Sequence, residues 1–113
     1  MKRLGPYLLF VVLVLGVAGC SGKDADPVGT WVMYYDKGCN GGQNRLEWHI
    51  QGNETFFDNN HDSGTWSVDE KDFALNYYKG WYFFGSIDDD WMSGSFSGIS
   101  SGCWSAQRVS DNP

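Results

Sequence analysis

The chain has 113 residues, and its 14 aspartates and glutamates outnumber its 8 lysines and arginines, which gives a formal net charge of −6. Because nucleic acid and anionic lipid head groups repel so acidic a chain, we expect no nucleic-acid partner. Aromatic residues make up 17% of the sequence, and glycine is far more frequent than proline. Aromatic and β-branched residues interrupted by Gly, Asn and Asp are typical of strands joined by turns, so the sequence predicts an all-β protein.

The first twenty residues are arranged like a secretory leader. Two basic residues are followed by an apolar run over residues 8–17, which is too short to span a membrane as a helix. The run ends in Val-Ala-Gly-Cys at positions 17–20, which resembles the lipobox of bacterial lipoproteins. This resemblance implies cleavage before Cys20 and a lipid on its thiol, which would anchor the chain in a membrane. The alternative is an ordinary secretory signal in which the cysteine has no role.

These features predict four segments. Residues 1–19 form a lipoprotein signal peptide, and residues 20–27 form the lipidated cysteine and a polar, flexible tether. Residues 28–109 form one small domain, and residues 110–113 form a frayed C-terminus. We expect the domain to be held at the bacterial cell envelope, on the outer or the cell membrane, facing the periplasm or the outside.

Within the domain, short apolar segments alternate with turns. Residues 45–51 show the pattern best, since Leu46, Trp48 and Ile50 fall on one face of a strand and polar residues on the other. The connections are mostly tight, so consecutive strands are expected to be antiparallel neighbours. Eight such strands can close into a small up-and-down barrel without exposed edges, and a two-sheet β-sandwich is the alternative. The predicted strands are 28–35, 45–51, 54–58, 64–68, 73–78, 81–87, 91–97 and 103–109.

Two cysteines remain besides Cys20, and an oxidising compartment favours their pairing. In an up-and-down barrel, the end of the first strand and the start of the eighth meet at one rim. Cys39 follows the first strand and Cys103 opens the eighth. A Cys39–Cys103 disulfide is therefore predicted, and it favours the barrel, although a sandwich could also bring the two cysteines together.

The first predicted strand contains Gly29-Thr30-Trp31. A Gly-x-Trp sequence on the first strand of an eight-stranded barrel resembles the lipocalin and avidin-like group, the calycins. In that group an Arg or Lys from the last strand crosses the barrel floor and packs on the tryptophan. The resemblance therefore implies a contact between Arg108 and Trp31.

Catalytic motifs are not evident in this sequence. The two histidines, His49 and His61, fall on the polar face of a strand and in an Asn- and Asp-rich turn. The sequence contains no Gly-x-Ser-x-Gly, His-Glu-x-x-His or phosphate-loop motif, and Asp88-Asp89-Asp90 lacks the spacing of a calcium loop. We therefore expect no enzyme activity, no metal and no cofactor.

Aromatic residues are the most informative feature for function. Alternation along the strands places five of them around the rim that carries the disulfide. An eight-stranded barrel has an interior that side chains can fill or that can hold one small ligand. The five rings are therefore either core or a concave site for a sugar-like or planar apolar ligand. They are Tyr35, Trp66, Tyr77, Trp81 and Trp104.

The sequence thus predicts a lipid-anchored binding module. An alternative is suggested by Tyr78, Tyr82 and Phe84, which are expected to lie side by side on the outside of the barrel. Together they would form a larger exposed apolar patch than scattered surface residues make. They favour an envelope interaction protein, in its most specific form an inhibitor of a hydrolase such as lysozyme or a protease. An acidic surface suits a basic enzyme of that kind.

The lipid anchor can be tested with Cys20→Ala. Because the predicted site of lipid attachment is the cysteine thiol, this variant should accumulate as an unlipidated precursor. Metabolic labelling with a fatty acid measures whether the lipid is attached. A variant that kept the lipid label would contradict the assignment of Cys20.

Overall fold

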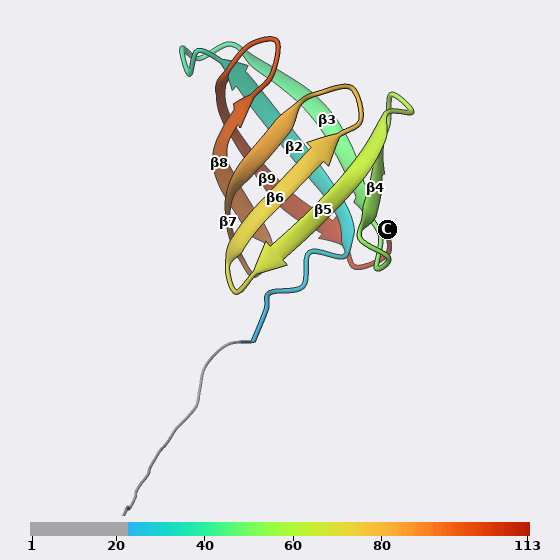
Figure 1. The fold of residues 1–113 in the computed structure, drawn as a ribbon. Helices are drawn as coiled ribbons and strands as arrows, with labels where there is room; N and C mark the ends of the chain where they lie inside the picture. The colour runs from blue at the N-terminus through green and yellow to red at the C-terminus, as the bar shows by residue number, and fades with distance from the viewer. Residues whose placement is uncertain (1–22) are drawn as a thin grey trace, which may run out of the picture.

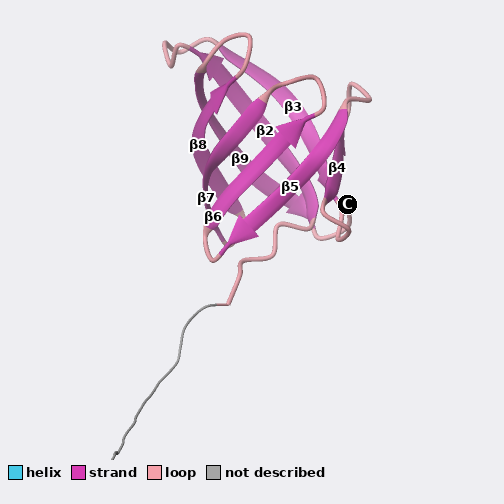
Figure 2. Ribbon diagram, viewed as in Figure 1, coloured by secondary structure: helices cyan, strands magenta, loops and turns pink. Residues whose placement is uncertain are grey.

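The computed structural model describes residues 23–113, in which all regular structure is β-strand. Eight strands form one closed antiparallel barrel in which each strand pairs with its neighbours in the chain and the last pairs with the first (Figures 1 and 2). The predicted all-β class and up-and-down barrel are thus confirmed. The strands are β2 (Gly29–Lys37), β3 (Gln43–Ile50), β4 (Thr55–Asp58), β5 (Ser63–Asp69), β6 (Asp72–Tyr77), β7 (Tyr82–Asp88), β8 (Trp91–Ser97) and β9 (Gly102–Ser110).

The predicted signal peptide and the predicted lipidation site at Cys20 lie outside the described residues. Over residues 23–113, no helix is long and apolar enough to cross a membrane. The segment before β2 reaches the barrel at the end where β2 begins, and the C-terminus lies at that same end (Figure 1).

All eight predicted strands are present, with ends that differ by at most two residues. The largest differences concern β2, which continues to Lys37, and β3, which begins at Gln43. Both extensions are polar, so hydrophobic alternation does not reveal them. They stay in the sheet because Asp36 pairs with Gln43 while Lys37 pairs with Gly102 on β9. Pairing on both sides of β2 therefore keeps these polar residues in the sheet without hydrophobic alternation.

Large side chains fill the barrel below its upper end. Trp48 lies at the centre, with its ring centroid 5.2 Å from that of Trp104 and 5.4 Å from that of Phe83. Eight large side chains of the lower interior are buried, and Val68 packs against them partly buried. The buried members are Trp31, Met33, Trp48, Ile50, Phe73, Leu75, Phe83 and Met92.

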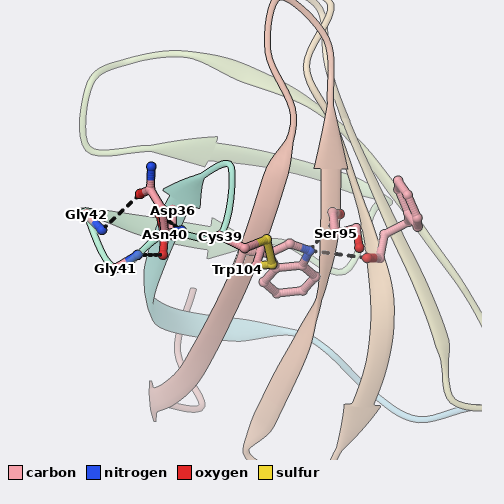
Figure 3. Close-up of a disulfide and its surroundings, with 9 residues drawn as sticks. Asp36, Cys39, Asn40, Gly41, Gly42, Ser95 and Trp104 are labelled. Carbon is pink, nitrogen blue, oxygen red and sulfur yellow. Dashed lines mark hydrogen bonds between the residues drawn. A yellow bond between two sulfur atoms is a disulfide. The ribbon is translucent and has the colours of Figure 1, made fainter.

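A disulfide fixes the β2–β9 pairing at the upper end. Cys39 follows β2, Cys103 lies in β9, and their Cα atoms are 5.2 Å apart (Figure 3). The predicted bridge is therefore confirmed. The Asp36 carboxylate accepts the backbone N–H groups of Asn40 and Gly41, which orders the loop that carries Cys39 (Figure 3).

Arg108 fixes the same pairing at the lower end. Its guanidinium carbon lies 4.7 Å from the centroid of the Trp31 ring, the contact that the calycin resemblance implies. The guanidinium donates to the carbonyls of Asp26, Val28 and Asp89, and its Nε donates to the Asp90 carboxylate. Arg108 therefore ties the incoming segment and the β7–β8 turn to the barrel floor.

The glycine that precedes Trp31 by two residues has a steric role in this arrangement. Gly29 has a φ of 144° and lies against the backbone of β9. A Cβ at this position would overlap the carbonyl oxygen of Ser110 and press on the Arg108 side chain. The Gly-x-Trp sequence therefore combines a close approach of backbone with the ring that Arg108 covers.

Arg108→Ala should lower the free energy of unfolding by about 2 kcal/mol, because it removes the cation–π contact and leaves several carbonyls without their charged donor. Arg45→Ala is the matched control, since the Arg45 side chain is 48% exposed against 13% for Arg108 and pairs with Glu47 on the barrel surface. The control should lose less than about 0.5 kcal/mol in a denaturant melt. Equal losses would contradict the structural role of Arg108.

Candidate functional site

A pocket of about 200 Å³ opens at the disulfide end of the barrel. Four loops meet there, joining β2 to β3, β4 to β5, β6 to β7 and β8 to β9 (Figure 1). We call this space the mouth pocket. Its apolar lining is Tyr35, Leu46, Trp81, Phe83 and Phe96, and its polar lining is Lys37, Asp58, Asn60, Asp62, Tyr77 and Lys79.

Aromatic rings form the apolar side of the mouth pocket. Phe83 and Phe96 are buried and stack on each other, with centroids 5.1 Å apart and planes 25° apart. Tyr35 meets the Phe96 ring edge-on at 5.8 Å, and Trp81 lies 6.0 Å from it. Tyr35 and Trp81 are only partly buried. Phe96 is therefore the centre of an aromatic base, and two partly exposed rings rise beside it.

A chain of buried hydrogen bonds closes the polar side. The indole N–H of Trp48 donates to the Tyr77 hydroxyl at 2.9 Å, and that hydroxyl donates to Asp58 Oδ2 at 2.8 Å. Asp58 is 2% exposed, and its Oδ1 accepts the backbone N–H groups of Asn60 and Asp62. Both oxygens of the carboxylate and the phenol are thus bonded within the protein.

Burial raises the pKa of Tyr77 above its ordinary value of 10.0, and the hydrogen bond to Asp58 and the negative charge of Asp58 act in the same direction. The phenol therefore stays protonated and keeps donating to Asp58 across the neutral range. Its role is structural, because it joins β6 to β4 over the intervening strand β5, beneath the opening.

Two lysines stand at the rim of the mouth pocket. Lys79 pairs with Asp62 at 3.3 Å, across the β4–β5 and β6–β7 loops. Lys37 is the last residue of β2 and is exposed. Among residues 23–113 no ion pair includes Lys37. Its backbone is held in place because Lys37 pairs with Gly102 and the next residue, Gly38, donates to the Ser101 carbonyl.

Three of the five aromatic residues expected at the mouth line the pocket, namely Tyr35, Tyr77 and Trp81. The position of Trp104 is corrected: it is buried in the core, where its indole N–H donates to the carbonyls of Phe84 and Ser95 (Figure 3). β7 and β8 approach closely here because glycines face each other at positions 85 and 94. Trp104 thus contributes to the base beneath the pocket.

The position of Trp66 is corrected as well. Its indole N–H donates to the Gln51 carbonyl and its backbone N–H to the Glu54 carbonyl, so it lies beside the β3–β4 turn, away from the mouth. The reason is the shortness of β4, whose first residue, Thr55, pairs with Thr65. Trp66 follows Thr65 and therefore lies beyond the lower end of β4.

Sequence reasoning missed the buried carboxylate of Asp58. The polar residues that follow it are typical of a turn, and an Asp at the start of such a turn often accepts local N–H groups. The turn signal was therefore present. Its burial depends on Tyr77, which is nineteen residues away in sequence and reaches it from β6, two strands along the barrel.

Metal-ligating residues and histidines are not gathered at the mouth pocket within the described residues. Within the described part of the chain, no three His, Cys, Asp or Glu residues are placed to hold a metal ion. His49 lies on the outside of the barrel, stacked on Phe57 with centroids 4.7 Å apart, and His61 is in the exposed β4–β5 turn. The mouth pocket instead offers aromatic rings on one side and polar groups on the other.

Comparison with known proteins adds no relative to this description. No protein-family model matches the chain. A search of curated proteins finds no match either.

Tyr77→Phe should lower the free energy of unfolding by about 1–3 kcal/mol, because the indole N–H of Trp48 and one oxygen of Asp58 both lose a buried partner. Tyr78→Phe is the control, since Tyr78 is 74% exposed, and it should change stability by less than about 0.5 kcal/mol. Similar losses of stability in the two variants would contradict the structural role of the hydrogen bonds that Tyr77 makes to Trp48 and Asp58.

The raised pKa of Tyr77 also predicts a pH dependence. Above pH 10.0 the phenol loses its proton in the unfolded chain and keeps it in the folded protein, so stability that is present below this pH is lost as the pH rises. Denaturant melts between neutral pH and pH 11 should show a steeper loss in the wild type than in Tyr77→Phe. Parallel pH profiles would argue against the protonated, buried phenol.

Proposed function

We propose that the chain is a binding module that holds one small ligand in the mouth pocket. The observation that carries this proposal is the pairing of two partly exposed rings, Tyr35 and Trp81, with a closed aromatic base. The pocket combines this aromatic side with a polar side, and small-molecule sites join aromatic walls to polar groups that orient the ligand. Rings of this kind stack on planar apolar groups or on the faces of sugars.

The volume of the pocket limits the ligand. Sites for drug-sized molecules span about 300–1,000 Å³, and this pocket has about 200 Å³. The core below it is filled by Phe83, Trp48 and Trp104, so a long chain would find no channel to enter. A single ring with a short substituent is the size that fits.

Binding is favoured over catalysis because both carboxylates that line the pocket are already engaged. Asp58 accepts hydrogen bonds on both oxygens, and Asp62 pairs with Lys79. A general acid or base needs a free position toward the reacting group. We therefore propose no reaction for this site.

The proposed anchor and the proposed site are compatible in direction. The incoming segment reaches the barrel at the Arg108 end (Figure 1). A lipid on Cys20 would therefore hold this end toward the membrane. The mouth pocket lies at the opposite end, facing away from the membrane. A ligand in the periplasm or outside the cell could then reach it.

A second candidate function, an interaction protein of the envelope, is favoured by aromatic rings on the outer face. Tyr82 and Phe84 on β7 stack with centroids 5.0 Å apart and are both exposed, and Tyr78 in the β6–β7 turn is exposed as well. Exposed neighbouring rings on an acidic protein suit a partner with a basic surface, such as a lysozyme or a protease.

Binding can be tested by a thermal-shift and calorimetric screen of small ring compounds and sugars. A ligand of the mouth pocket should raise the melting temperature of the wild type. Trp81→Ala should weaken its affinity about tenfold, because an aromatic wall is lost. Trp91→Ala is the control, since Trp91 is exposed on β8, outside the pocket, and it should bind like the wild type.

A screen in which no small molecule stabilises the protein would contradict the proposal. A rise in melting temperature with a lysozyme or a protease, abolished by Phe84→Ser, would then favour the second candidate. Equal ligand affinity in Trp81→Ala and the wild type would place binding outside the mouth pocket.

A further inference from the structure

Each polar group at the floor of the mouth pocket, the Tyr77 hydroxyl and the Asp58 carboxylate, already has hydrogen-bond partners within the protein. The Tyr77 hydroxyl accepts from Trp48 and donates to Asp58, and the other Asp58 oxygen accepts two backbone N–H groups. A ligand hydroxyl that reached this depth would leave its hydrogen bonds with water and meet groups that are already bonded to one another. A sugar carries hydroxyls around its whole edge, so the floor disfavours it. The part of the ligand that enters first should be apolar.

The shape of the floor favours a flat apolar group. Phe83 and Phe96 present a stacked pair, and Tyr35 and Trp81 stand around Phe96 at 5.8 and 6.0 Å. A planar ring can contact such rings edge-on and in offset stacks, which are the preferred aromatic geometries.

The rim supplies the opposite chemistry. The Asp62 carboxylate and the Lys79 ammonium pair with each other, and Asp58 is satisfied below them. Within residues 23–113, Lys37 is in no ion pair, although it lines the pocket. An ammonium group is a compact charge that readily binds a carboxylate or a phosphate. Lys37 is thus the group at the rim that offers a charge without an internal partner.

The acidity of the whole chain does not cancel this local charge. The net charge of −6 is spread over the sequence, and charges farther away than a Debye length of about 8 Å are largely screened at physiological salt. The ligand's anionic group would meet Lys37 directly at the rim. The backbone of Lys37 is also fixed, since β2 pairs with β9 at this residue and the disulfide follows two residues later.

We propose that the ligand of the mouth pocket is a small aromatic carboxylate. Its ring lies on Phe83 and Phe96, beside Tyr35 and Trp81, and its carboxylate binds the Lys37 ammonium at the rim. This inference rests on the proposed function and names the class of ligand for the same site.

The test is isothermal titration of the protein expressed from its full sequence with three probes. They are 3-phenylpropionate, its neutral amide 3-phenylpropanamide, and methyl glucoside. The acid should bind about two- to fivefold more tightly than the amide, the range expected for one exposed ion pair, and the glucoside should bind most weakly. Raising the salt concentration should reduce the advantage of the acid.

Lys37→Met removes the charge and keeps the length of the side chain. It should weaken binding of the acid to the level of the amide and leave the amide unchanged. Lys71→Met is the matched control, because Lys71 is an exposed lysine in the β5–β6 turn, and it should alter neither affinity. Denaturant melts of both variants should match the wild type.

Each contrary result has a distinct meaning. Equal binding of acid and amide, unaffected by Lys37→Met, would overturn the carboxylate assignment and leave the proposed binding function standing. Tighter binding of the glucoside than of the acid and the amide would overturn the assignment of an aromatic ligand and favour a sugar in the same pocket. No binding of any of the three probes would overturn this inference, and the broader screen with Trp81→Ala would then decide the proposed function separately.

Discussion

The pairing of β9 with β2 is the constraint on which the rest of this molecule depends, because it closes the sheet. It removes the two edges that an open sheet would expose and turns one face of every strand into a shared interior. The pairing is fixed at both ends, by the Cys39–Cys103 disulfide at the mouth and by Arg108 on Trp31 at the floor. Lys37 stands beside the mouth pocket because β9 holds the end of β2 there.

Closure also determines where space remains inside the barrel. Large rings occupy the lower interior, and the floor contact of Arg108 covers Trp31 from below. Toward the mouth, the chain of hydrogen bonds from Trp48 through Tyr77 to Asp58 replaces apolar packing. Because every group in that chain is bonded, it seals the interior as a core would. The open space above it is shallow, apolar at its base and charged at its rim.

Much of this fold could be predicted from local sequence, and the site only in part. Alternation of residues and turn chemistry predict each strand, and closure then predicts the partner of Cys39 and the rim to which Tyr35 belongs. The depth of an individual ring could not be predicted in this way. It depends on the length of neighbouring strands, as the short β4 shows for Trp66, and on close approach at Gly85 and Gly94, as Trp104 shows. The buried Asp58 depends on a contact with Tyr77, which lies two strands away.

The hydrogen-bonded chain from Trp48 through Tyr77 to Asp58 seals the base of the mouth pocket, which makes the pocket shallow and limits the ligands that can enter it. Hydrogen exchange of the tryptophan indole N–H groups, followed by ¹H–¹⁵N NMR at neutral pH, tests it most directly. The indole N–H of Trp48, bonded to the Tyr77 hydroxyl, should exchange as slowly as that of Trp31, which is bonded to the Pro27 carbonyl. Trp91, which is 58% exposed, should exchange fast. Exchange of Trp48 as fast as that of Trp91 would contradict the account, since water would then reach the core beneath Tyr77.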